Sequence, residues 1–175
     1  MSTFALFKNK LLSVVPILIA VGIAAKVASW GETFSTGTLE RHHQVVDAAN
    51  AILNDLLDAE TSVRGFAITG DEEFLGPYKA ALERIDPDTG ALRVLVADDP
   101  QQRERMKEIE PLITKKFSLL REGIELRRNS GLEAIVELSK LKRGKTTMDA
   151  IRGLIADMKA EENRRASESL NLTWW

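Results

Sequence analysis

The sequence predicts an all-α protein. Ala, Leu, Glu, Lys and Arg dominate its 175 residues, whereas aromatic residues make up only 6%, a composition that favours helices. Apolar residues recur at alternating steps of four and three, the spacing of helices that pack against one another. No segment shows the two-residue alternation typical of a strand. We therefore expect an up-down-up-down four-helix bundle, preceded by one transmembrane helix.

The first predicted element is a membrane-spanning helix over residues 11–30. A helix of about 20 residues is about 30 Å long, which matches the hydrocarbon core of a bilayer. Lys26 lies near its end, where the long side chain can reach the headgroups beside Trp30. A cleaved signal peptide is the alternative, because the most apolar part, residues 11–25, is short. Trp30 and the apolar residues after Lys26 favour an uncleaved anchor.

Charged and aromatic residues predict the orientation of the chain in the membrane. Lys8 and Lys10 precede the apolar segment, so residues 1–10 are expected in the cytoplasm and residues 31–170 outside it. The expected location is a bacterial inner membrane, with the main domain in the periplasm. Residues 171–175 end in two tryptophans, which predicts the start of a second membrane helix; a frayed tail is the alternative.

The first helix of the main domain is predicted to end at Thr69. Gly70 can adopt the positive φ that terminates a helix, and Asp71 is placed to cap the helix that follows. The heptad spacing predicts that one face of the first helix is buried in the bundle. That face comprises Val45, Ala49, Ile52, Leu56, Ala59, Val63 and Phe66.

The second helix is predicted to begin near Asp71 and to be interrupted at Pro87. Proline lacks the backbone N–H, so it breaks or kinks a helix unless it occupies a first turn, which here Asp86 would cap. Before the proline, the helix carries the side chains of Phe74, Leu75, Tyr78, Ala81, Leu82 and Ile85.

A third helix is predicted from Pro100 to Arg128, with Asp99 as its cap and a kink at Pro111. A short helix over residues 132–141 should follow. The buried face of the third helix is predicted to comprise Met106, Ile109, Ile113, Phe117, Leu120 and Ile124.

The last helix is predicted over residues 145–170. Arg143 and Gly144 are expected to separate it from the short helix before it. Its buried face is predicted to comprise Met148, Ile151, Ile155 and Met158.

Composition excludes several classes of function. The chain has 24 basic and 26 acidic residues, a balance that argues against nucleic acid as a partner. It has no cysteine and only two histidines, the adjacent His42 and His43, so no metal site is expected. No nucleophile–base pair stands out either, and we expect no catalytic residue and no cofactor.

Several polar residues are candidates for ligand binding or signalling. Glu60 and Arg64 are four residues apart and can form an ion pair, which either takes part in a signal or only fixes the packing register. Tyr78 either presents its hydroxyl to a ligand or belongs to the core. Basic residues at predicted helix ends either attract an anionic ligand or cap helix dipoles; these are Arg127, Arg128, Lys142, Arg143 and Lys145.

Residues 58–82, DAETSVRGFAITGDEEFLGPYKAAL, carry a motif that resembles a known family. Its residues are Asp58, Glu60, Thr61, Arg64, Gly65, Phe66, Thr69, Gly70, Phe74, Leu75, Pro77 and Tyr78. The motif closely resembles the opening of the CHASE domain of the third type, a sensory extracellular module associated with cyclases and histidine kinases. The resemblance covers about residues 45–169 and continues through Leu126, Arg127, Arg128, Gly144, Lys145, Met148, Asp149, Ile151, Arg152, Met158, Glu161 and Glu162.

This resemblance implies a sensory function. Members of the family typically lie between two membrane helices, ahead of a kinase, cyclase or chemoreceptor output domain. Asp149 and Arg152 become candidate signalling residues through the resemblance alone. Residues 86–90 depart from it, since an uninterrupted helix is expected there.

The sequence therefore predicts the sensory module of a bacterial transmembrane receptor. We expect it to work as a homodimer and to bind a small molecule or a protein that the sequence does not identify. The alternative is a membrane-anchored structural or scaffolding bundle without a sensory role. A hydrolytic enzyme is the weakest hypothesis, because no set of catalytic residues supports it.

Overall fold

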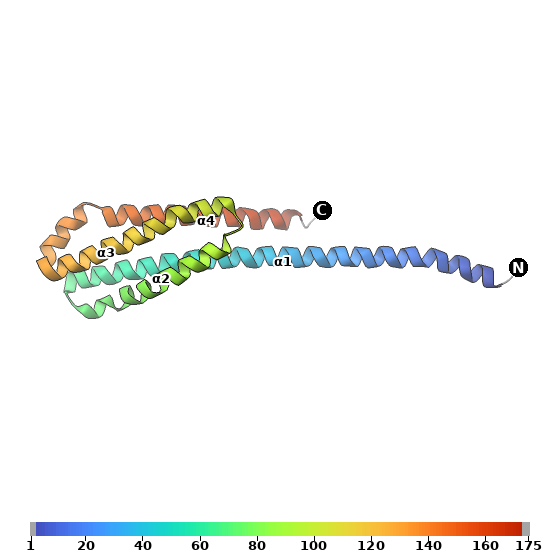
Figure 1. Cartoon of the computed structure of the whole chain (residues 1–175), viewed down its shortest axis with the longest axis horizontal. Coiled ribbons are helices and arrows are strands. Elements are labelled where there is room, and N and C mark those ends of the chain that lie inside the picture. The colour runs from blue at the N-terminus through green and yellow to red at the C-terminus, as the bar shows by residue number, and fades with distance from the viewer. Residues whose placement is uncertain (1–2, 173–175) are drawn as a thin grey trace. The chain divides into compact units, whose positions relative to one another are not determined.

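The chain is all-α in a computed structural model that describes the backbone of residues 3–172 and the side chains of residues 21–23, 26 and 40–168. The elements are the helices α1 (Thr3–Thr69), α2 (Gly76–Leu95), α3 (Pro100–Lys140) and α4 (Arg143–Leu172), and the short 3₁₀ helix η1 (Glu72–Leu75) (Figure 1). The described part contains no strand. Residues 41–165 form one compact unit, and residues 1–40 with 166–175 form another.

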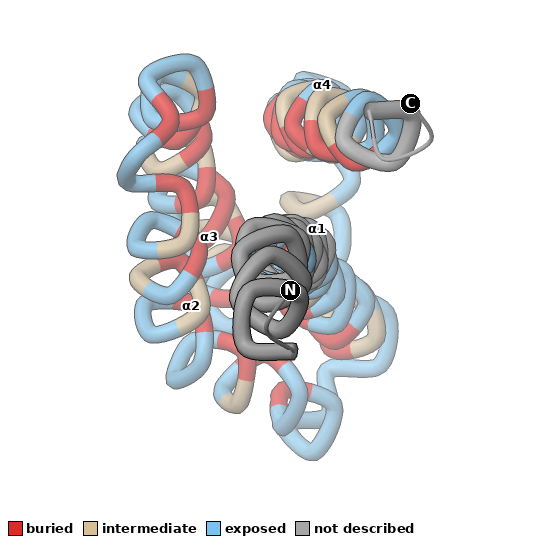
Figure 2. Tube along the Cα trace, turned by 90° about the vertical axis from the view of Figure 1, so that its right-hand side faces the viewer, coloured by how far each residue is buried: buried red, intermediate tan, exposed pale blue. Residues whose placement is uncertain are grey.

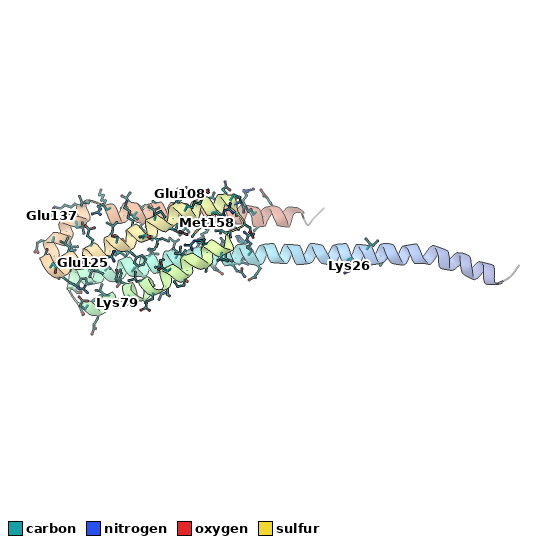
Figure 3. The ribbon with its side chains drawn as sticks, in the orientation of Figure 1. Lys26, Lys79, Glu108, Glu125, Glu137 and Met158 are labelled. Atoms are coloured by element: carbon teal, nitrogen blue, oxygen red, sulfur yellow. The ribbon has the colours of Figure 1, made fainter. Side chains whose placement is uncertain are left out.

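The three apolar faces predicted from the heptad spacing are confirmed. Each residue named for the first, third and last helices is buried, and together they form one hydrophobic core with residues of α2. Figure 2 shows that the buried positions of α3 and α4 recur along one side of each helix, as amphipathic packing requires. Met158 lies in this interior, whereas Lys79 and Glu137 are on the outside (Figure 3).

Polar side chains link the helices around this core. Arg84 of α2 donates two hydrogen bonds to the buried Asp55 of α1, at 2.9 and 2.6 Å. Gln102 of α3, which is fully buried, donates to the Glu162 carboxylate of α4 at 2.8 Å. Lys159 of α4 donates to Asn50 of α1 at 2.8 Å. The described helices of residues 41–165 therefore form a bundle joined by polar as well as apolar contacts.

The predicted end of the first helix is confirmed at the turn after Thr69. Gly70 has a φ of 75°, and the Asp71 carboxylate accepts a hydrogen bond from the backbone N–H of Glu73. The capped element is the 3₁₀ helix η1, however, and α2 begins only at Gly76. The predicted start of the second helix near Asp71 is thus five residues too early, because one tight turn precedes the α-helix.

The break expected at Pro87 is absent. Helix α2 continues through this residue to Leu95. Proline removes one backbone hydrogen bond, but Ile85 and Thr89 on either side are buried. Their packing into the core holds the helical course that the local sequence disfavours.

The cap of α3 is confirmed, since the Asp99 carboxylate accepts hydrogen bonds from the backbone N–H groups of Gln101 and Gln102. Helix α3 also contains Pro111, and its course changes at Gly131, which has a φ of 81° and a ψ of −169°. The segment 132–140 after this point is helical, as predicted.

The turn before α4 differs from the prediction. Lys142, with a φ of 53°, reverses the chain in the left-handed conformation, and α4 already begins at Arg143. Arg143 and Gly144 are therefore the first residues of α4 and not its boundary. Sequence reasoning assigned the turn to glycine, the usual residue for this conformation, and Lys142 is an exception.

The side chains of the predicted membrane segments, residues 11–30 and 171–175, lie for the most part outside the described part of the structure. Within the described part, no helix combines the length and the apolar character needed to cross a bilayer.

Candidate functional site

The candidate site is a pair of cavities in the unit formed by residues 41–165. The larger has a volume of about 470 Å³ and the smaller about 340 Å³. Glu60, Arg64 and Lys145 line both cavities, so these three residues mark the place where the two meet. All three were candidates from the sequence, and the fold brings them together from α1 and α4.

The larger cavity has apolar walls and a basic lining. Helix α1, the middle of α3 and the segment 132–140 supply its walls, with Val63, Ala67, Leu119, Leu120, Ile135 and Leu138 as the apolar residues. One acidic side chain, Glu60, faces five basic ones, which are Arg64, Lys116, Lys142, Arg143 and Lys145. A volume of this size falls in the range of about 300–1,000 Å³ that is typical of small-molecule sites.

Lys116 is the buried charged group of this cavity. Its side chain is only 1% exposed, although lysine is almost never fully buried without a partner. The Nζ atom donates to the Glu60 carboxylate at 3.0 Å and to the backbone carbonyl oxygen of Gly144 at 3.2 Å. Lys116 thus connects α1, α3 and the first turn of α4.

Glu60 is shared between two cations. One carboxylate oxygen accepts from Lys116, and the other accepts from the Arg64 guanidinium at 2.5 Å. Arg64 is 73% exposed, so only the pair with Lys116 is shielded from water. The three side chains, which line the cavity, together carry one net positive charge.

The smaller cavity gathers the remaining candidates of α4. Lys145, Asp149 and Arg152 line it together with Glu60 and Arg64. The hydrogen bond from Lys145, followed by the charges of Lys145 and Arg152, lowers the pKa of Asp149. Asp149 therefore stays ionised and forms ion pairs with both basic side chains in the lining of this cavity.

Tyr78 lies elsewhere, in the core. It is 9% exposed, and its ring contacts that of Phe117 with centroids 6.1 Å apart. Burial raises the pKa of the Tyr78 hydroxyl. The backbone N–H of Tyr78 donates to Ser62 of α1, so the residue fastens α2 to α1.

Arg127 and Arg128 also lie apart from the cavities, beside the turn between α1 and η1. Arg127 donates to the backbone carbonyl oxygen of Ala67 at 2.7 Å. Arg128 donates twice to the Glu72 carboxylate, at 2.7 Å each, and its guanidinium lies 5.7 Å from the centre of the Phe66 ring. The hydrogen bond from Arg128 lowers the pKa of Glu72. Both arginines thus secure a turn and do not line the cavities.

The sequence analysis did not identify Lys116, Ile135 or Leu138 as residues of the site. It identified Lys142 and Arg143 as basic residues that either attract an anionic ligand or cap helix dipoles. The periodic pattern gave one available signal, since Lys116 lies between Ile113 and Phe117 on the buried face of α3. A lysine there needs a buried partner, but the pattern alone does not identify that partner.

Comparison with known proteins defines the class of the domain. The fold is similar to that of the Rhodopseudomonas palustris histidine kinase HK9 sensor domain, whose crystal structure matches with a TM-score of 0.62. The two chains are 24% identical over 75% of this chain and 98% of that chain. The CHASE3 domain matches residues 35–171, and the chain therefore belongs to the CHASE3 family of sensory domains. No curated protein matches the chain.

Proposed function

We propose that the chain is the extracytoplasmic sensory part of a bacterial inner-membrane receptor, in which ligand binding is relayed through membrane helices to a histidine kinase, cyclase or chemoreceptor output. The observation that carries this proposal is the cavity around the buried Lys116, which lies inside the matched CHASE3 domain. In this proposal the domain itself is not an enzyme. Glu60, Arg64, Lys145, Asp149 and Arg152 would take part in ligand binding or signalling.

The proposed arrangement has an up-down-up-down bundle on a membrane. Residues 1–10 lie in the cytoplasm, residues 11–30 cross the bilayer, residues 31–170 form the periplasmic domain, and residues 171–175 begin a second span. The exposure of the apolar Val21 and Ile23, 61% and 59%, supports this arrangement, since lipid would cover such side chains.

Cysteine labelling tests the orientation, because the chain has no native thiol. Asn9→Cys and Asp98→Cys are compared with an impermeant thiol reagent on intact cells, after the outer membrane has been made permeable. The proposal expects labelling at position 98 alone. Labelling at position 9 alone would reverse the orientation.

We also propose that the receptor works as a homodimer. An interface between subunits converts small shifts into discrete states, whereas a monomer would have only its own two membrane spans to move. Single cysteines along residues 32–46 should form disulfide-linked dimers in membranes with a period of three to four residues. Crosslinking without a period would contradict a helical dimer interface.

Sensing itself is tested with a chimera in which the chain is joined to a kinase output that drives a reporter gene. Ala67→Trp fills the larger cavity, and Val94→Trp is the matched control on an exposed position of α2. We expect Ala67→Trp to change the output while Val94→Trp leaves it unchanged. Equal output from all three proteins, with equal amounts in the membrane, would support a scaffold instead of a sensor.

A further inference from the structure

We propose that the larger cavity binds a small amphipathic monocarboxylate, with its carboxylate at Lys116 and its apolar body against the aliphatic walls. This inference rests on the proposed sensory function and adds the chemical class of the ligand. Three observations support it: the charge balance of the lining, the spare donor of Lys116, and the composition of the walls.

The charge of the lining selects an anion. Five basic side chains and one acidic side chain line the cavity. Glu122 pairs with Arg143 at 3.2 Å and Asp149 pairs with Lys145, so part of this positive charge is already compensated. Lys142 has no ion-pair partner among the described residues, and the cluster of Lys116, Glu60 and Arg64 retains one positive charge. One ligand carboxylate would bring that cluster to neutrality.

The buried ammonium group provides the recognition point. A lysine ammonium has three N–H donors, and Lys116 uses two of them, on Glu60 and on the Gly144 carbonyl oxygen. One donor is left on an ammonium group whose side chain is 1% exposed, and a charge-assisted hydrogen bond to such a shielded group is strong. The first turn of α4, at Gly144 and Lys145, adds the positive end of a helix dipole beside it.

The walls select the rest of the ligand. Leu119, Ile135 and Leu138 are only partly buried, although they are aliphatic and line a cavity. An aliphatic ligand body would remove their remaining surface from water, which is favourable by about 25 cal/mol per Å². A purely hydrophilic anion would leave these walls wet, and a neutral apolar compound would leave the Lys116 donor unpaired.

Four probes separate these requirements. Hexanoate has both the charge and the apolar body, acetate has the charge alone, hexanamide has the body without the charge, and hexylamine has the opposite charge. The full chain is placed in nanodiscs of zwitterionic lipid that has no carboxylate in its headgroup, so the lipid does not compete with the probes for Lys116. Binding is measured by calorimetry, and empty nanodiscs serve as the control. We expect hexanoate to bind at least about tenfold more tightly than each of the other three, the difference of about one charge-assisted hydrogen bond or one buried alkyl chain.

Two variants connect the binding to the cavity. Lys116→Met should weaken hexanoate at least about tenfold, whereas Lys107→Met, a 70% exposed lysine on the same helix, should leave its affinity unchanged. Lys142→Asn removes a charge at the cavity and keeps a residue that tolerates a positive φ, so it serves if Lys116→Met does not fold. It should weaken hexanoate about threefold.

Several results would overturn the inference. They are hexanamide or hexylamine binding as tightly as hexanoate, wild-type affinity in a folded Lys116→Met or in Lys142→Asn, or no hexanoate binding by the folded wild-type chain. If the reporter chimera still responds to Ala67→Trp in that case, the cavity senses another class of ligand. If hexanoate binds but the reporter does not respond, the site exists and the sensory function fails.

Discussion

Because Glu60 is shared between two cations, removing Glu60 should cost more stability than removing Lys116. Lys116 is 1% exposed and has Glu60 as its ion-pair partner, whereas Glu60 is also paired with Arg64. Glu60→Ala leaves a buried ammonium whose hydrogen-bond partner is a backbone carbonyl, and removing one partner of a buried pair costs about 3–5 kcal/mol. Lys116→Met keeps the shape of the aliphatic stem and leaves Glu60 paired with Arg64. We expect that change to cost about 1 kcal/mol.

The free energy of unfolding measures this difference. Urea unfolding of the full chain in detergent, followed by far-ultraviolet circular dichroism, gives the midpoint and slope for each variant. Glu104→Ala is the matched control, because it breaks an exposed pair with Lys107, 66% and 70% exposed, and should cost less than about 0.5 kcal/mol. A loss of about 3–5 kcal/mol is a large share of the total stability of a typical domain.

Equal losses for Glu60→Ala and Lys116→Met would refute the reasoning, because they would show that Arg64 cannot stabilise Glu60 alone. A loss below about 1 kcal/mol for Glu60→Ala would show that water reaches Lys116 through the cavity. The double variant should cost less than Glu60→Ala, since it removes the unpaired buried charge.

Three further predictions concern stability. Leu56→Asp places a carboxylate at a position with no exposure and should lower the free energy of unfolding by about 4 kcal/mol or more, read from the urea midpoint. Gly70→Ala should cost about 1–2 kcal/mol, because φ is 75° and the new Cβ would lie 2.9 Å from Arg127; a neutral effect would show that the turn can change its conformation. Burial, together with the Asp55 carboxylate, raises the pKa of Asp88, so the folded state favours the protonated form of this side chain. Protonated Asp88 therefore stabilises the fold at acidic pH, and this contribution is lost as the pH rises through the raised pKa. Asp88→Asn should remove that loss in urea midpoints measured against pH, and an unchanged pH profile would contradict this account.

Much of the fold could be predicted from the sequence because it depends on periodicity and on local capping. Every residue assigned to the three heptad faces is buried, and Asp99 and Gly70 act where the cap and turn rules place them. The errors occur where tertiary packing overrides a local preference. Pro87 stays helical because its buried neighbours hold it, and Lys142 takes the conformation that the rules assign to glycine.

The site was only half predictable for a different reason. Glu60, Arg64 and Lys145 were recognisable as charged residues near helix ends or seams, and they do line the cavities. Arg127 and Arg128 were chosen by the same criteria, and Tyr78 was chosen for its hydroxyl, but all three lie elsewhere. Whether a charged residue lines a cavity depends on which helices converge there, and a single helix pattern does not contain this information.

The larger cavity also depends on residues without charged or polar side chains. Ile135 and Leu138 belong to the segment 132–140, and this segment reaches the cavity because the chain changes course at Gly131. A residue with a side chain would be strained at a φ of 81°, so glycine allows the change of course that brings this segment to the cavity. Gly131 itself does not line the cavity. The same segment leads directly to Lys142 and the first turn of α4, where Gly144 accepts the hydrogen bond from Lys116. A ligand that packs on Ile135 and Leu138 therefore acts on a segment continuous with α4, the helix whose far end leads towards the proposed second membrane span.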